Sequence, residues 1–373
     1  MKPSVFKFYV AAVAASVFTS SALAHEVAAP EFAVTNVTPL PFLVEKSGPV
    51  RAPKPTTLAP GQQSSGQGFW KFVAAPELVP VPAAAQSKVV GAHGTIFVDK
   101  AADIAYWGLQ GVGWIGFSNK LSASWIVAGN PAFGTGNLHG ADIWPRGKQT
   151  PLVAVADNES GKIHLTDTTF QNVETLGRPN FDTYATNETF KPTDVAFSSA
   201  HELWIVDGYG RQKFVPAEFS PLKWREEIHG GGNFSKTLHG VTYEKSHDEL
   251  IFSARPEGQL KRLARKTLRA QEILQLPRGM TLCDVDVWGD YCLAACLDGP
   301  NKTPGPLFII NLKKRAIVAT IKPKEDLGYA DAQHMHDAAW YVTGTGRDQE
   351  VYLLFTNWNP GGIGALKLVN IPD

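Results

Sequence analysis

Short runs of alternating apolar and polar residues cover most of the chain after residue 90, and this alternation is typical of half-buried β-strands. Six of these runs begin alike, with a polar residue ahead of alternating small, β-branched or aromatic residues. The six openings are His93, His139, Thr193, His239, Cys283 and His336. They lie 44 to 54 residues apart. A repeat of this length predicts a β-propeller, in which each repeat forms one blade.

The third repeat shows how one blade is built. Alternating runs predict strands at 193–197, 202–206 and 211–215, and a fourth strand near 224–228. The second run is followed by Asp207-Gly-Tyr-Gly, and Gly and Asp are residues that tight turns favour. The second and fourth repeats have the same order of runs and turns. Four short antiparallel strands per repeat are typical of a propeller blade. The sequence therefore predicts an all-β, six-bladed β-propeller with four-stranded blades over residues 89–373.

The residues before the repeats are predicted to form two segments of another kind. Residues 1–24 contain lysines, an apolar run and the small-residue pattern Ala22-Leu-Ala, which together are typical of a signal peptide. The protein is therefore expected in the periplasm or secreted. Residues 25–88 are rich in Pro and Ala, which predicts a leader or linker. The end of this segment, at 77–81, could supply an edge strand. No later run of 18 apolar residues predicts a membrane span.

Composition agrees with a large, turn-rich β protein, since 44% of the 373 residues are hydrophobic and there are 34 glycines and 26 prolines. The formal net charge is zero and no basic run occurs, which argues against nucleic acid or an anionic membrane as a partner. We expect a monomer that acts on a small-molecule or peptide-derived substrate.

The three cysteines, Cys283, Cys292 and Cys296, all lie in the fifth repeat. In an oxidising compartment Cys283 could pair with either of the other two, and the sequence leaves the pairing open. A local structural role is favoured over a catalytic thiol, because no histidine is arranged in the sequence to activate one.

Three of the histidine openings, His139, His239 and His336, stand in alternate repeats. The first strand of each blade lines the central channel, so alternate copies on a six-fold ring are about 120° apart. Three imidazoles in that arrangement can converge on one axial ion and leave a position open, which is typical of catalytic zinc. The alternative is that each histidine is hydrogen-bonded to backbone. His93 breaks the alternation and is expected outside the ligand set or in a turn only, while Thr193 and Cys283 are expected to contribute no ligand.

Asp337 follows His336 directly, and its side chain is expected to point away from that of its neighbour. A carboxylate there could bind a harder cation such as calcium together with backbone carbonyls. The alternative is a hydrogen bond that caps a strand.

The motifs at these positions resemble those of peptidyl-α-hydroxyglycine α-amidating lyase (peptidylamidoglycolate lyase), and the chain is also similar to other NHL-type six-bladed propellers. The similarity spans roughly residues 135 to 340. It rests on motifs in the family's order, namely Leu138-His-Gly, Lys191-Pro-Thr-Asp-Val-Ala, Val206-Asp-Gly-Tyr, Leu238-His-Gly, Ala254-Arg-Pro-Glu-Gly and Met335-His-Asp.

The resemblance implies a role for each matched residue. His139, His239 and His336 would bind zinc, and Asp337 would hold a structural calcium with a carbonyl such as that of Ala141. Tyr209 would remove the proton from the substrate's hydroxyl, and Arg255 would bind or polarise the substrate. The reaction implied is cleavage of a carbinolamide to an amide and glyoxylate.

The chain departs from the family's pattern at several points. The family has a further Arg in the first blade, where this chain has Ile104-Ala-Tyr-Trp-Gly-Leu-Gln. This difference favours another substrate, or a stacking surface at Trp107 or Trp114 in place of the Arg. Two other functions stay open: a metal-dependent hydrolase of the lactonase kind, and a non-enzymatic binding propeller of the NHL type.

Overall fold

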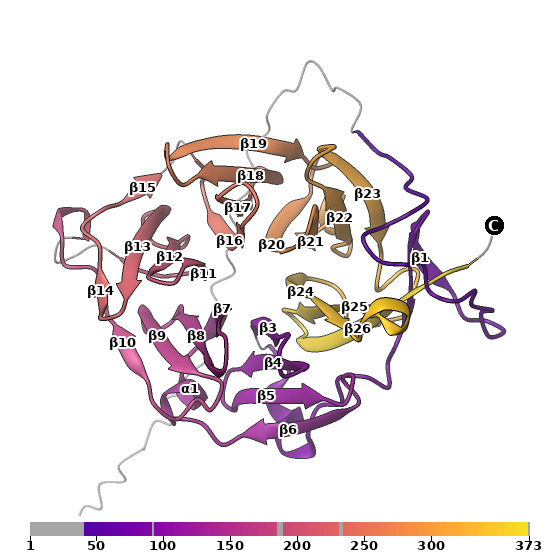
Figure 1. Ribbon diagram of the computed structural model, residues 1–373, viewed down its shortest axis with the longest axis horizontal. Coiled ribbons are helices and arrows are strands. Elements are labelled where there is room, and N and C mark those ends of the chain that lie inside the picture. Colours follow the sequence, from indigo (N-terminus) through magenta and orange to yellow (C-terminus); the bar gives the residue numbers. More distant parts are fainter. Residues whose placement is uncertain (1–40, 92, 185–188, 231–233, 372–373) are drawn as a thin grey trace, which may run out of the picture. The chain divides into compact units, whose positions relative to one another are not determined.

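The structure is a computed structural model that describes residues 41–91, 93–184, 189–230 and 234–371. In this part of the chain, six antiparallel sheets are arranged in a ring, which is a six-bladed β-propeller (Figure 1). The first strand of each blade lies nearest the centre of the ring. The predicted fold class is therefore confirmed. The predicted signal peptide, residues 1–24, and residues 25–40 lie outside the described residues.

Four blades are four-stranded sheets of consecutive strands. Blade one contains β3 (Ile96–Asp99), β4 (Ile104–Leu109), β5 (Gly113–Ser118) and β6 (Ala123–Val127). Blade two contains β7 (Leu138–Arg146), β8 (Gln149–Asp157), β9 (Lys162–Asp167) and β10 (Glu174–Leu176). Blade four contains β16 (Leu238–Glu244), β17 (Glu249–Ala254), β18 (Gln259–Ala264) and β19 (Arg269–Gln275). Blade five contains β20 (Thr281–Trp288), β21 (Tyr291–Asp298), β22 (Leu307–Asn311) and β23 (Ala316–Ile321).

The other two blades have additional strands. Blade three contains β11 (Asp194–Ser199), β12 (Glu202–Asp207), β13 (Lys213–Phe219), β14 (Leu222–Trp224) and β15 (His229–Gly230). Blade six contains β24 (Met335–Thr343), β25 (Glu350–Asn357), β26 (Gly362–Val369), β2 (Trp70–Ala74) and β1 (Ser64–Gln67). The helices are short: α1 (Ala132–Thr135), η1 (Ala83–Lys88), η2 (Asp182–Tyr184), η3 (Pro300–Lys302) and η4 (Gly346–Asp348). None of the described helices has the length and apolar character needed to cross a membrane.

Blade six joins the two ends of the described chain. Strand β2 pairs antiparallel with β26, from Lys71 opposite Val369 to Ala74 opposite Leu366. The sheets therefore begin earlier than residue 89, the start expected from the sequence, while residues 77–81 form turns and bends instead of the edge strand expected there. The reason is the alternation in Trp70-Lys-Phe72, whose two aromatic side chains are fully buried in the core between blades five and six.

The core is divided into six apolar clusters, one at each junction between neighbouring blades. This division follows from the alternation of side chains along a strand, since each blade buries both of its faces against the two blades beside it. Trp107 belongs to the junction of blades six and one, and Trp114 to that of blades one and two. Each indole is 1% exposed, so neither offers the stacking surface considered in place of the family's Arg.

Candidate metal centre

Four of the innermost strands have a break in their ladder at the residue that opens the repeat. The register with the next strand shifts at His139 in β7, at His239 in β16, at Cys283 in β20 and at His336 in β24. A bulge of this kind takes a residue out of the ladder and redirects its side chain. These four side chains are buried, with exposures of 0 to 3%.

The three histidines predicted as ligands lie together. Their ring centroids are 4.7 Å apart for His139 and His336, 4.9 Å for His139 and His239, and 5.2 Å for His239 and His336. Nδ1 of His139 bonds to the carbonyl of Thr193 at 2.8 Å, and Nδ1 of His239 bonds to that of Cys283 at 2.9 Å. A ring nitrogen that donates to a carbonyl leaves the lone pair on Nε2, which orients the ring as a ligand.

The surroundings of His239 and His336 favour the neutral ring, as ligation requires. Burial lowers the pKa of His239 well below its ordinary value, and Arg255 and His139 lower it further. Burial likewise lowers the pKa of His336, with added effects from His139 and His93. Within the described part of the chain, neither ring nitrogen of His336 has a hydrogen-bond partner. A buried polar group without a partner costs about 1–3 kcal/mol, and a bound cation would remove that cost. The donor set therefore fits a transition metal.

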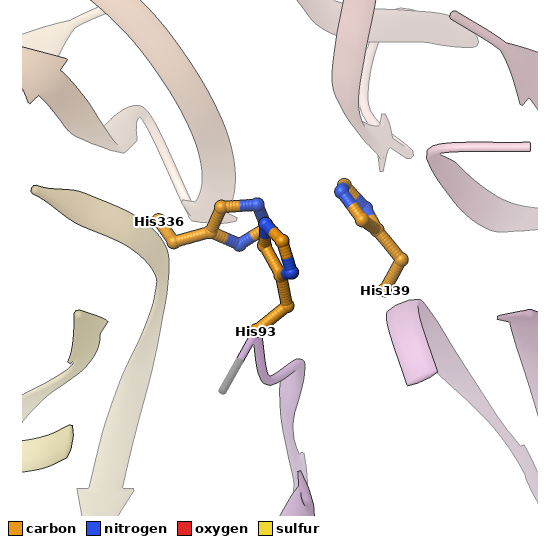
Figure 2. Close-up of side chains that lie close together, drawn as sticks. All are labelled: His93, His139 and His336. Carbon is orange, nitrogen blue, oxygen red and sulfur yellow. The ribbon is translucent and has the colours of Figure 1, made fainter. Parts of the chain in front are cut away.

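His93 joins this cluster, although the sequence placed it outside the ligand set. Its ring centroid lies 4.9 Å from that of His336 and 5.5 Å from that of His139. The ring also stacks on Trp358, at 5.2 Å with an angle of 10° between the planes. One nitrogen from each of His93, His139 and His336 lies within 4.8 Å of the other two. Figure 2 shows the three rings close together, each from a different segment of the chain.

Cys283 also lies at the site, although the sequence predicted that it would contribute no ligand. All three cysteines are free and buried, so the expected disulfide is not formed. Leu282 stands opposite Cys296, Val287 stands opposite Cys292, and the bulge at Cys283 turns its side chain elsewhere. Its sulfur lies 3.6 and 3.7 Å from the two ring nitrogens of His239. The signal was present in the sequence, because Cys283 opens its repeat as the histidines open theirs.

Tyr209 and Arg255 both reach the histidines from turns after the second strands of their blades. The Tyr209 hydroxyl lies 2.9 Å from Nε2 of His239, and Nη1 of Arg255 donates to that hydroxyl at 2.5 Å. Burial raises the pKa of Tyr209 to about 12, and the Arg255 guanidinium opposes this shift. Among these residues, burial therefore outweighs the effect of Arg255 on the pKa of Tyr209. Asp207 shapes the turn by accepting from the backbone N–H groups of Lys191 and Arg211, each at 2.7 Å.

Asp337 belongs to a second layer, made of the carboxylates that follow three of the openings. Each accepts a backbone N–H from the next blade: Asp194 from Val241 at 2.6 Å, Asp284 from Ala338 at 3.3 Å and Asp337 from Ile96 at 3.1 Å. The capping alternative considered for Asp337 is thus present. Burial, with a contribution from Asp194, raises the pKa of Asp337 to about 7.

The glycines after two of the histidines make room for this carboxylate layer. A Cβ atom on Gly140 would lie 2.2 Å from a carboxylate oxygen of Asp194, and one on Gly240 would lie 2.3 Å from an oxygen of Asp284. The His-Gly pair therefore serves two purposes, a ligand on the axis and close approach of the next blade.

Beyond the carboxylates, the innermost strands surround a cavity of about 500 Å³. Asp337 and Ala141, the pair considered for calcium, both line it, together with Asp142 and Asp286. Asp142 and Asp286 lie three residues after His139 and Cys283, which is about 10 Å along a strand. The propeller axis thus carries imidazoles at one level and carboxylates at the next.

Comparison with known proteins bears on the fold alone. No family model matches the chain, and no curated protein sequence matches it. Among solved structures, luciferin-regenerating enzyme shares 9% identity and a TM-score of 0.51, over 76% of this chain and 94% of its own. Regucalcin, a calcium-binding protein from Agrobacterium tumefaciens, shares 12% identity and a TM-score of 0.50, over 80% of this chain and 97% of its own. At these identities the likeness shows one thing about this chain, that it folds as they do.

Proposed function

We propose that this chain is a metal-dependent lyase that cleaves a carbinolamide to an amide and glyoxylate. The observation that carries the proposal is the position of the Tyr209 hydroxyl, 2.9 Å from the nitrogen of His239 that would ligate a metal and 2.5 Å from the Arg255 guanidinium. A proton acceptor, a cation and a cluster of neutral imidazoles then meet at one point. The proposal includes zinc as the metal, and a small or peptide-derived substrate.

When bound, a cation on His139, His239 and His336 supplies Lewis acidity that lowers the pKa of a substrate hydroxyl. Tyr209, in its ionised form, accepts the hydroxyl proton at its oxygen. Arg255 favours that ionised form by its charge and can also bind the carboxylate of the departing glyoxylate. The carbon–nitrogen bond breaks as the hydroxyl becomes the carbonyl, and the proton passes from Tyr209 to the amide nitrogen.

The test combines metal analysis with product detection. The purified chain is expected to contain zinc and to release glyoxylate from an α-hydroxyglycine compound, and His239→Ala is expected to lose both. His201→Ala, which changes an exposed histidine in a turn, is the matched control and should keep both. A chain that binds no metal, or a His239→Ala variant with unchanged turnover, would contradict the proposal.

A second candidate is a metal-dependent hydrolase of the lactonase kind, which the cavity lined by carboxylates favours. Asp142, Asp286 and Asp337 offer oxygen ligands there, and oxygen is what calcium prefers. Under this reading the chain hydrolyses a lactone in a calcium-dependent manner, and Asp286→Asn lowers that rate while His239→Ala does not. The two variants, assayed on both substrates, separate the candidates.

A further inference from the structure

We propose that the axial centre binds two metal ions, with His336 between them. One ion is held by His93, His139 and His336, and the other by His239, Cys283 and His336. The inference rests on the proposed metalloenzyme function and deepens it: it keeps the three histidines as ligands, divides them between two ions, and adds one further ligand to each ion.

The donor atoms form two groups in space, and these groups are the basis of the proposal. Within each set of three residues, one donor atom from every residue lies within 4.8 Å of the others. Two ligands on one tetrahedral zinc ion lie about 3.3 to 3.6 Å apart, given metal–ligand distances of about 2.0 to 2.3 Å. The sulfur of Cys283 and Nε2 of His239 are already 3.7 Å apart. Side-chain adjustments of about 1 Å therefore complete either set.

His336 is the residue common to both groups, and its ring is suited to bridging them. His139 and His239 each use Nδ1 on a backbone carbonyl, so each has one nitrogen for a metal. His336 makes no such bond from either nitrogen within the described residues, and its side chain is 2% exposed. An imidazole that gives up its N–H proton has a lone pair on both nitrogens. One ring can then ligate an ion on each side.

A bulge in the backbone brings the Cys283 side chain to the histidines. The same kind of bulge that redirects His139, His239 and His336 also redirects Cys283, whereas Thr193, which opens the third repeat, precedes its strand. A thiolate is a soft ligand that selects zinc, copper(I) or their neighbours over calcium and magnesium. Binding of the ion displaces the thiol proton, as is general for cysteine ligands.

Carboxyl groups directly follow two of the ligands, and a bound cation would favour their ionised form. Asp284, which is half-buried, and Asp337, which is buried, directly follow Cys283 and His336 in the chain, and Asp194 completes the layer behind them. The Cys283 thiolate and the deprotonated His336 ring add two further negative charges. These groups oppose both the repulsion between the ions and the positive charge of Arg255.

The test is a titration of the metal-stripped full-length chain with Co²⁺, followed by visible and near-ultraviolet absorption and by metal analysis. We expect two equivalents per chain, with a thiolate-to-cobalt charge-transfer band. His93→Phe keeps a ring for stacking on Trp358 and should bind one equivalent with the band retained. Cys283→Ser should bind one equivalent without the band. Cys292→Ser, which changes a buried thiol of the same blade, should behave as the unchanged chain.

Other results of the Co²⁺ titration would contradict the two-ion centre. One equivalent without a thiolate band overturns this inference and leaves the proposed lyase standing, whereas no bound Co²⁺ overturns both. Two equivalents in both His93→Phe and Cys283→Ser also overturn it. If either variant fails to fold, as judged by thermal unfolding, the magnetic coupling of two Co²⁺ ions in the unchanged chain decides. Independent ions would rule out the bridge through His336.

Discussion

The Tyr209 hydroxyl lies between His239 and Arg255, at the edge of the histidine cluster. This arrangement separates two functions that are often combined in one residue. In the proposed function, the imidazoles would hold the ion and the phenol would accept the proton. A change at Tyr209 should therefore affect turnover and leave metal content unaltered.

Tyr209→Phe removes the proton acceptor and keeps the ring. We expect it to retain zinc while kcat falls about 10²- to 10⁴-fold, the usual contribution of one general base. Metal analysis and glyoxylate release measure the two effects. Tyr352→Phe, which changes a buried tyrosine in strand β25 of blade six, is the control and should change neither quantity. A Tyr209→Phe enzyme that keeps full turnover would assign the base to another group.

The positive charge of Arg255 affects how readily the Tyr209 hydroxyl loses its proton. Burial raises the pKa of Tyr209 to about 12, and the guanidinium lowers it. Under the proposal, Tyr209 acts as a base in its ionised form, so kcat/KM should rise with pH, and Arg255→Gln should move that rise to higher pH. The pH profile is the readout, because a purely structural role of Arg255 would lower the rate without displacing the profile.

At the scale of the strand, the sequence was sufficient for the fold and for bringing His139, His239 and His336 together on the axis. Alternation gave the strands of the second, third and fourth repeats to within a few residues, because each blade buries both faces. The histidines were visible because equivalent positions in a repeat become equivalent positions on the ring.

What escaped prediction depends on local backbone geometry. Cys283 opens its repeat, but nothing in Leu282-Cys-Asp announces the bulge that turns its side chain toward His239. His93 precedes β3 in an irregular segment, where periodicity gives no direction for a side chain. The burial that holds Tyr209 neutral depends on which turns meet, and sequence order does not specify that.

Glu45 lies in the segment before strand β2, and its carboxylate contacts residues of blades five and six. The Glu45 carboxylate accepts from Nε1 of Trp70 at 3.2 Å, from Nδ2 of Asn311 at 2.9 Å and from Nζ of Lys314 at 2.8 Å. Burial acts to raise the pKa of Glu45, but these bonds outweigh it and the pKa is lowered.

Glu45→Gln should therefore lower the free energy of unfolding at pH 7 by about 1–3 kcal/mol. Because the folded-state pKa is depressed, the contribution of Glu45 is present above its ordinary value of 4.5 and is lost as pH falls through the folded-state value. The difference between variant and unchanged chain should shrink in acid. Denaturant unfolding at several pH values measures it, with the exposed Glu325→Gln as control. An equal difference at all pH values would show that charge is not the cause.

For the molecule as a whole, the carboxylates on the axis change stability with pH in the direction opposite to that of Glu45. Burial raises the pKa of Asp142 to about 6, and it also raises the pKa values of Asp194, Asp284 and Asp286. The folded protein thus binds more protons than the unfolded chain in mildly acidic solution. Stability should fall as pH rises from about 4 to above 6, and Asp142 alone accounts for a change on the order of 3 kcal/mol.

Asp142→Asn removes one of these titrations. We expect a shallower decline of unfolding free energy between pH 4.5 and pH 8, measured by denaturant titration without added metal. Addition of Ca²⁺ at pH 8 should raise the stability of the unchanged chain if the carboxylates bind it, by the linkage between ligand binding and folding. A stability that climbs steadily over this pH range would contradict the prediction.

The pairing of β2 with β26 also has a consequence for the order of events during synthesis. Residues 70–74 are synthesised well before their partner strand, which ends at Val369. Blade six stays incomplete until β26 has left the ribosome, and the ring cannot close before then. His93 and His139 are made long before His336, so the axial site comes into existence only with the last blade. A nascent chain truncated anywhere before β26 would be unable to assemble it.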